Sequence, residues 1–124
     1  VALVSKAHPA AKQRSISLAK LTHESFVLYK GRVRDSALAA CRAAGFEPRI
    51  ACESGELETI RSLVAAGLGI AILPQLATRQ SDANCVAVRL RGDPVERQVA
   101  VLSRSGHSAS PSAAAFREIL VARV

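Results

Sequence analysis

Two short turns in the sequence carry residue types that could bind a small ligand. The first, Tyr29-Lys30-Gly31-Arg32, places a phenol, two cations and a glycine next to one another. The second, Glu53-Ser54-Gly55, places a hydroxyl beside another glycine. Cations, together with backbone N–H groups that a glycine leaves accessible, are suited to a small anion such as a carboxylate. The candidate ligand-binding residues are therefore Tyr29, Lys30, Gly31, Arg32, Ser54 and Gly55.

The elements around these turns are predicted to bring them together. Phe26–Tyr29 and Arg49–Cys52 are predicted to be strands, and a helix is expected to follow each of them. The first helix is predicted over Val33–Ala44, because Gly45 can end a helix and Pro48 blocks its continuation. Strands that alternate with helices indicate a parallel sheet, and ligands bind beyond the carboxyl ends of such strands.

The segment from Glu53 to Pro74 predicts one helix followed by one buried strand. Gly67 follows the last apolar turn and can take the left-handed conformation that ends a helix. Ile70–Leu73 is apolar without alternation, as expected for a strand covered on both faces, and Pro74 cannot continue the hydrogen-bonding ladder. Apolar residues at helical spacing line one face of the helix: Leu57, Ile60, Leu63 and Val64.

The sequence of Leu63–Pro74, LVAAGLGIAILP, resembles a recurrent signature in the effector-binding domain of LysR-type transcriptional regulators. Leu3–Ala10, Ser17–Leu21 and Phe26–Tyr29 resemble other segments of that family in the same order, so the resemblance covers nearly the whole chain. It implies an α/β fold like that of type 2 periplasmic binding proteins, with one complete βαβαβ subdomain and part of a second. By this comparison residues 7–84 form the complete subdomain, and residues 1–6 and 85–124 form the partial first subdomain with the hinge strands.

The same resemblance implies a function and a set of partners. The chain would sense a small-molecule effector, an anion such as a carboxylate, and would form a homodimer or tetramer in which the helix near Val33–Ala44 lies at the dimer interface. DNA would be bound only through a helix-turn-helix head that has no counterpart here. The resemblance implies a cytoplasmic regulator without catalytic residues, cofactor or metal. The alternative is a fragment of a secreted type 2 periplasmic solute-binding protein; an enzyme domain would need a catalytic pair that the sequence does not offer.

From the residues alone, a plainer interpretation of the two turns is favoured. Gly31 and Gly55 would merely shape the turns, and Lys30 and Arg32 would be solvated cations. The resemblance reverses this preference, because effectors of the family bind between the subdomains at these turns.

The composition limits the other functions that the chain could have. Seventeen lysines and arginines against ten acids give a net charge of +7. The cations are scattered and only four residues are aromatic, which favours a solvated basic surface over a nucleic-acid interface. No apolar segment reaches the roughly 18 residues that a membrane span needs. Because the chain has no methionine and begins at Val1 in an expected strand, we expect it to be a fragment. On the side of the incomplete first subdomain, we expect either exposed apolar surface or its coverage by another molecule.

The three cysteines form no metal-binding or CxxC pattern. The segment Val33–Cys41 resembles the redox helix of the peroxide-sensing branch of the family, in which Cys41 would be the second cysteine. Arg32 stands where the peroxide-reactive thiol would be, so that two-cysteine switch cannot form as it does there. We therefore interpret Cys41 as a core residue, and expect Cys52 and Cys85 to be reduced thiols.

The remainder of the chain predicts a strand pair and a last helix. Val86–Leu90 and Gln98–Leu102 are expected to pair through a turn at Arg91–Pro94. Ser110 and Pro111 are a good N-cap and first residue for a helix that runs to Ala122.

Overall fold

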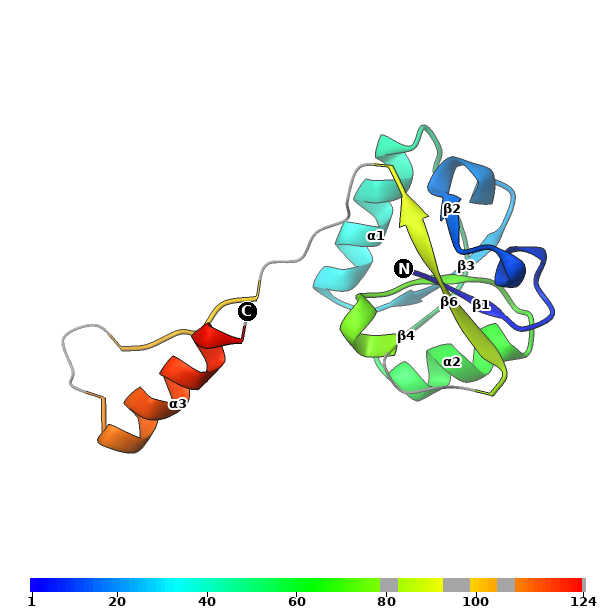
Figure 1. The fold of residues 1–124 in the computed structure, drawn as a ribbon. Coiled ribbons are helices and arrows are strands. Elements are labelled where there is room, and N and C mark those ends of the chain that lie inside the picture. The colour runs from blue at the N-terminus through cyan, green and yellow to red at the C-terminus, as the bar shows by residue number, and fades with distance from the viewer. Residues whose placement is uncertain (79–82, 93–98, 105–108, 124) are drawn as a thin grey trace.

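The computed structural model describes residues 1–78, 83–92, 99–104 and 109–123, which form an α/β body followed by one C-terminal helix (Figure 1). In chain order the elements are β1 (Ala2–Ser5), the 3₁₀ turn η1 (Pro9–Lys12), β2 (Ser15–Ser17), η2 (Leu18–Leu21), β3 (Ser25–Tyr29), α1 (Arg32–Ala43), β4 (Arg49–Ser54), α2 (Leu57–Ala65), β5 (Ala71–Ile72), η3 (Gln75–Thr78), β6 (Cys85–Arg91) and α3 (Pro111–Ala122).

The run β3-α1-β4-α2-β5 forms the predicted parallel βαβαβ unit. β3 pairs in parallel with β4 along its whole length, with an irregularity after Phe26. On its other side Phe26 forms a parallel bridge to Ile70, and the Val27 N–H donates to the Ile70 carbonyl at 2.8 Å. β3 therefore lies between β4 and the start of β5, and the carboxyl ends of the three strands share one edge of the sheet.

β1 joins this unit to the remainder of the body, where it lies beside β6 (Figure 1). It pairs antiparallel with β5 on one side and with β6 on the other, and β6 also pairs in parallel with β2. The predicted pairing of Val86–Leu90 with Gln98–Leu102 is wrong for the residues that the structure describes, since residues 99–102 form no strand. The physical reason is that β6 pairs instead with two strands from the start of the chain, with β1 along residues 85–88 and with β2 along residues 89–91. Gln98 and the predicted turn residues Asp93 and Pro94 lie outside the described residues.

Apolar side chains pack on both faces of β3. Phe26 and Leu28 pack in a cluster with Leu38 and Cys41 of α1. The intervening Val27 packs on the opposite face, in a second cluster. Burial on both faces fixes the positions of β3 and of the turn that follows it. The other members of the second cluster include Leu3, Ile60 and Val64.

Both long helices of the unit end at the glycines that the sequence indicates. After α1, the Gly45 N–H donates to the Arg42 carbonyl and the Phe46 N–H to the Cys41 carbonyl, which is a Schellman motif. The same two hydrogen bonds form at the end of α2, where the backbone N–H groups of Gly67 and of the residue after it are the donors. Both glycines have positive φ, and the Phe46 ring lies 6.0 Å from that of Phe26.

The segment Ser17–Leu21 is divided between two elements. Ser17 is the last residue of β2, and the four residues after it form η2. In a 3₁₀ turn, side chains three positions apart lie above one another. Leu18 and Leu21 are accordingly both buried.

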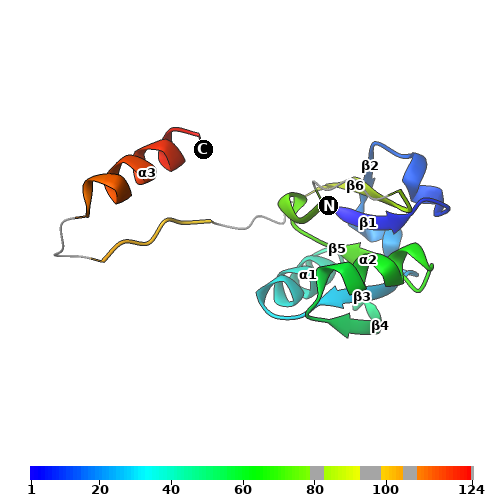
Figure 2. The ribbon, with the colours of Figure 1, turned by 90° about the horizontal axis from the view of Figure 1, so that it is seen from below.

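α3 begins as predicted, with the Ser110 hydroxyl accepting the Ala113 N–H at 3.3 Å and Pro111 as its first residue. It lies away from the α/β body in both views (Figures 1 and 2), and none of its residues is buried. Across the described ranges, no helix is long and apolar enough to cross a membrane.

Candidate functional site

The structure brings the two predicted turns side by side at the carboxyl edge of the sheet. Tyr29 ends β3, Ser54 ends β4, and the two residues are register partners. Immediately beyond them, the Lys30 N–H donates to the Ser54 carbonyl at 2.9 Å. The β3–α1 turn and the β4–α2 turn are thus connected directly through their backbones.

The first turn places two cations at the start of α1. Gly31 is the N-cap, with φ 86° and ψ −154°, a conformation that is essentially restricted to glycine. As a glycine it provides no side-chain acceptor for the N–H groups of the first helical turn, which carry the positive end of the helix dipole. Lys30, Gly31 and Arg32 are exposed and Tyr29 is half-buried. This end of α1 combines exposed cations with a helix N-terminus that no side chain caps, an arrangement suited to an anion.

The second turn, between β4 and α2, is followed by acidic residues rather than by cations. Glu56 is the N-cap of α2, and Glu58 lies in the first turn, where it already complements the helix dipole. The half-buried Ser54 hydroxyl accepts the Glu56 N–H at 3.1 Å, so it is engaged within the turn. Gly55 is exposed. An approaching anion would meet the two carboxylates here, and the α1 turn is therefore the more favourable of the two.

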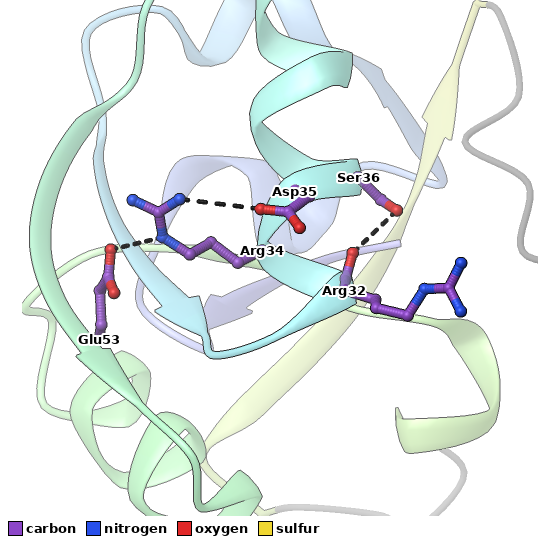
Figure 3. Close-up of polar contacts among 5 residues, drawn as sticks. All are labelled: Arg32, Arg34, Asp35, Ser36 and Glu53. Atoms are coloured by element: carbon purple, nitrogen blue, oxygen red, sulfur yellow. Dashed lines mark hydrogen bonds and ion pairs between the residues drawn. The ribbon is translucent and has the colours of Figure 1, made fainter.

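An ion pair that the sequence did not predict connects the two turns (Figure 3). Arg34, in the first turn of α1, donates from Nε to Oε1 of Glu53 on β4 at 2.8 Å. Its Nη1 lies 3.9 Å from Asp35. The Arg32 side chain points away from this pair, while its backbone carbonyl accepts from the Ser36 hydroxyl. In the sequence, the signal for this ion pair is that Arg34 and Glu53 have opposite charges and each lies next to one of the two turns. This signal becomes informative once β3 and β4 are known to be parallel neighbours.

The cysteine interpretation is confirmed for Cys41. Its side chain is 1% exposed and packs in the cluster beside α1. Burial first, and the charge of Glu47 second, raise the pKa of the Cys41 thiol to about 11. A thiol in this state is protonated at neutral pH and is a poor nucleophile. Of the other two cysteines, Cys85 is buried and Cys52 is half-buried, and no disulfide joins any of the three.

Within residues 1–78, 83–92, 99–104 and 109–123, no three His, Cys, Asp or Glu side chains come together as ligands for an ion. The chemistry that the described site supports is reversible binding of a small anion by cations and backbone N–H groups.

Comparison with known proteins places this geometry in context. A sequence model of the family described as LysR substrate binding domain matches residues 1–124. The transcriptional dual regulator GltC of Bacillus subtilis (strain 168) is 33% identical over 123 residues, which is 97% of this chain and 41% of that protein. The chain thus spans about two fifths of the length of this curated relative.

Two solved structures have a similar fold. The regulatory domain of Synechocystis PCC6803 CcmR in complex with 2-PG gives a TM-score of 0.81 over 99% of this chain and 61% of that one, at 23% identity. The effector-binding domain of BenM with its effector benzoate gives a TM-score of 0.68 over 76% of this chain and 45% of that one, at 25% identity.

Proposed function

Because the chain belongs to the LysR substrate-binding domain family, we propose that it is the effector-sensing part of a LysR-type transcriptional regulator. Its mixed α/β architecture is that of the family's effector-binding domains, which have a fold like that of type 2 periplasmic binding proteins. The match to regulators over the whole chain favours this function over that of a secreted solute-binding protein.

The proposed effector is a small anion such as a carboxylate, bound at the α1 turn. The observation that carries this proposal is the pair of exposed cations, Lys30 and Arg32, beside the N-cap Gly31 at the carboxyl edge of a parallel sheet. BenM, whose effector-binding domain is similar to this chain, binds benzoate, which is a carboxylate. Tyr29 would line the site, and Ser54 and Gly55 would contribute the neighbouring turn.

We propose a division into two subdomains. Residues 7–84 would form the complete effector-binding subdomain, and residues 1–6 and 85–124 would belong to the other. The pairing of β1 with β6 supports this proposal, because two adjacent antiparallel strands provide the two connections that a hinge needs. Effector binding would then act by shifting the population of subdomain arrangements rather than by catalysis.

The longer parent protein would use this domain to control transcription in the cytoplasm. Its DNA contacts would come from a helix-turn-helix head, and its homodimer or tetramer would place α1 at the subunit interface. Support comes from the curated relatives, which are named as transcriptional regulators and are longer than this chain.

Thermal shift or calorimetry with a panel of small carboxylates and phosphates tests the site. We expect a ligand that stabilises the parent protein to lose affinity by about tenfold or more in Arg32→Ala, because a charge-assisted contact contributes about 1.5–3 kcal/mol. Ser54→Ala should weaken binding less, since its hydroxyl is engaged with Glu56.

The matched control is Arg42→Ala, which removes an exposed arginine at the opposite end of α1. It should leave the affinity unchanged. Stabilisation by an anion that is equally strong in the Arg32 and Arg42 variants would exclude the α1 turn as the site.

A further inference from the structure

The Arg34–Glu53 ion pair connects two segments that lie 19 residues apart in the sequence. Arg34 belongs to the first turn of α1, and Glu53 is the residue before Ser54 on β4. The Nε to Oε1 distance is 2.8 Å, and the side chains are 35% and 30% exposed. Partial burial reduces the screening of this pair by solvent, so it holds α1 to β4 more firmly than a fully exposed pair would.

The ion pair lies beside a backbone contact between the same two segments. The Lys30 N–H donates to the Ser54 carbonyl at 2.9 Å, and the Arg34 N–H donates to the Gly31 carbonyl at 2.9 Å. Gly31 has the greatest backbone freedom in this turn. Contacts on both sides of it restrict that freedom before any ligand arrives.

The charges around Arg34 argue against its being a ligand-binding cation. Glu53 and Asp35 both lie within 4.0 Å of its guanidinium, so an anion approaching Arg34 would meet two carboxylates. Arg32 points in a different direction (Figure 3), and among the described residues no carboxylate forms an ion pair with it.

We propose that Arg34 and Glu53 form a clasp that positions the two turns, and that Arg34 is a positioning residue rather than a contact of the anion. This inference rests on the proposed anion site at the α1 turn for its functional consequence. The clasp orders the turn in advance, so less conformational freedom is lost when an effector binds at Lys30 and Arg32.

Hydrogen exchange of the Lys30 amide, measured on the 124-residue chain without ligand, tests the clasp itself. We expect exchange to be about three- to fivefold faster in Glu53→Gln and in Arg34→Gln, the range that a partly exposed ion pair supports. The charge-swapped double variant Arg34→Glu/Glu53→Arg should recover most of the protection. The matched control is Glu47→Gln, which breaks the 2.6 Å pair between Arg42 and Glu47 at the other end of α1 and should not affect Lys30.

Titration with benzoate and with inorganic phosphate, followed by NMR, tests the functional consequence. For whichever probe binds, Glu53→Gln and Arg34→Gln should weaken binding by about three- to fivefold, and the charge swap should restore it. The dependence of the dissociation constant on NaCl concentration should keep its slope in these variants and become shallower in Arg32→Gln, because Arg32, unlike Arg34, would contact the anion.

Two results would overturn the clasp. Unchanged exchange at Lys30 in both single variants would show that the ion pair does not hold the turns. Tighter binding in Glu53→Gln, with loss of binding in Arg34→Gln, would show that Arg34 is the anion receptor and that Glu53 competes for it. If exchange accelerates as expected but neither probe binds the wild-type chain, the clasp stands and the proposed affinity of this site for these anions fails.

Discussion

At the residue scale, Gly31 has two roles, because it is the last residue of the turn after β3 and also the N-cap of α1. Its φ of 86° and ψ of −154° are accessible to glycine and strained for any other residue. No atom lies within 4 Å of the position that a β-carbon would take, so the cost of a side chain there is a cost of backbone conformation alone. Gly55, on the neighbouring turn, has equally open space but no positive φ.

This contrast predicts a difference between two alanine substitutions. We expect Gly31→Ala to lower the free energy of unfolding by about 1–3 kcal/mol, the cost of holding a residue in a sparsely populated backbone region. Gly55→Ala should change it by less than about 0.5 kcal/mol, as is usual for an exposed site. Urea denaturation of both variants measures the difference. Equal effects of the two substitutions would mean that Gly31 relaxes out of its turn without cost.

Cys41 makes stability depend on pH. Because the pKa of its thiol is raised in the folded chain, from 9.0 to about 11, the folded state keeps a proton that the unfolded state releases. The stabilisation is therefore complete below pH 9 and is lost as the pH rises from about 9 to about 11. Thermal unfolding followed across this range should show a shallower decline in Cys41→Ala, even though that variant is less stable throughout. The same decline in both proteins would assign the effect to other groups that titrate there, such as lysine and tyrosine.

At the scale of elements, two glycines between α2 and β5, Gly67 and Gly69, are required for different reasons. Gly67 has φ 79° and ends α2, whereas a β-carbon on Gly69 would overlap the carbonyl oxygen of Ser25. That carbonyl also accepts the Ile70 N–H at 2.8 Å, which is one of the bonds that hold β5 against β3. The first glycine is required by backbone conformation and the second by space.

Substitution by asparagine and by alanine separates these two causes. At Gly67 we expect asparagine to be tolerated better than alanine, which should cost about 1–2 kcal/mol, because asparagine enters the left-handed region more easily. At Gly69 both should destabilise strongly, near the upper end of the about 1–3 kcal/mol that overpacking costs, since either adds a β-carbon. Chemical denaturation of the four variants measures this pattern. Equal losses for asparagine and alanine at Gly67 would contradict the conformational explanation.

The elements that the sequence predicts correctly are those with local signals. Gly45 and Gly67 end helices, and the apolar strand Phe26–Tyr29 follows from composition alone. The partners of β6 were predicted wrongly, because strand pairing depends on segments far apart in the sequence. The Arg34–Glu53 pair was missed for the same reason. The six candidate binding residues do lie together at one edge, and their contact with an effector stays a prediction.

At the scale of the whole molecule, the described chain buries its apolar residues unevenly. Within the α/β body, apolar side chains pack on both faces of β3, whereas Phe116 and Ile119 of α3 are 63% and 55% exposed. These two residues are three positions apart and therefore share one side of the helix. Val101 and Leu102, before α3, are also exposed, so the expected apolar surface is observed.

Exposed apolar surface of this kind drives association, and the chain should show it in solution. We expect multi-angle light scattering to find a mass that rises with concentration above that of the 13.1 kDa monomer. The double variant Phe116→Ser/Ile119→Ser should reduce this association, whereas Ala115→Ser, at a small exposed residue of the same helix, should not. The thermal midpoint of the α/β body should stay unchanged in both variants, because no residue of α3 is buried. A monomer at every concentration would show that the chain covers these side chains itself, and a lowered thermal midpoint in the double variant would show that they pack against the body.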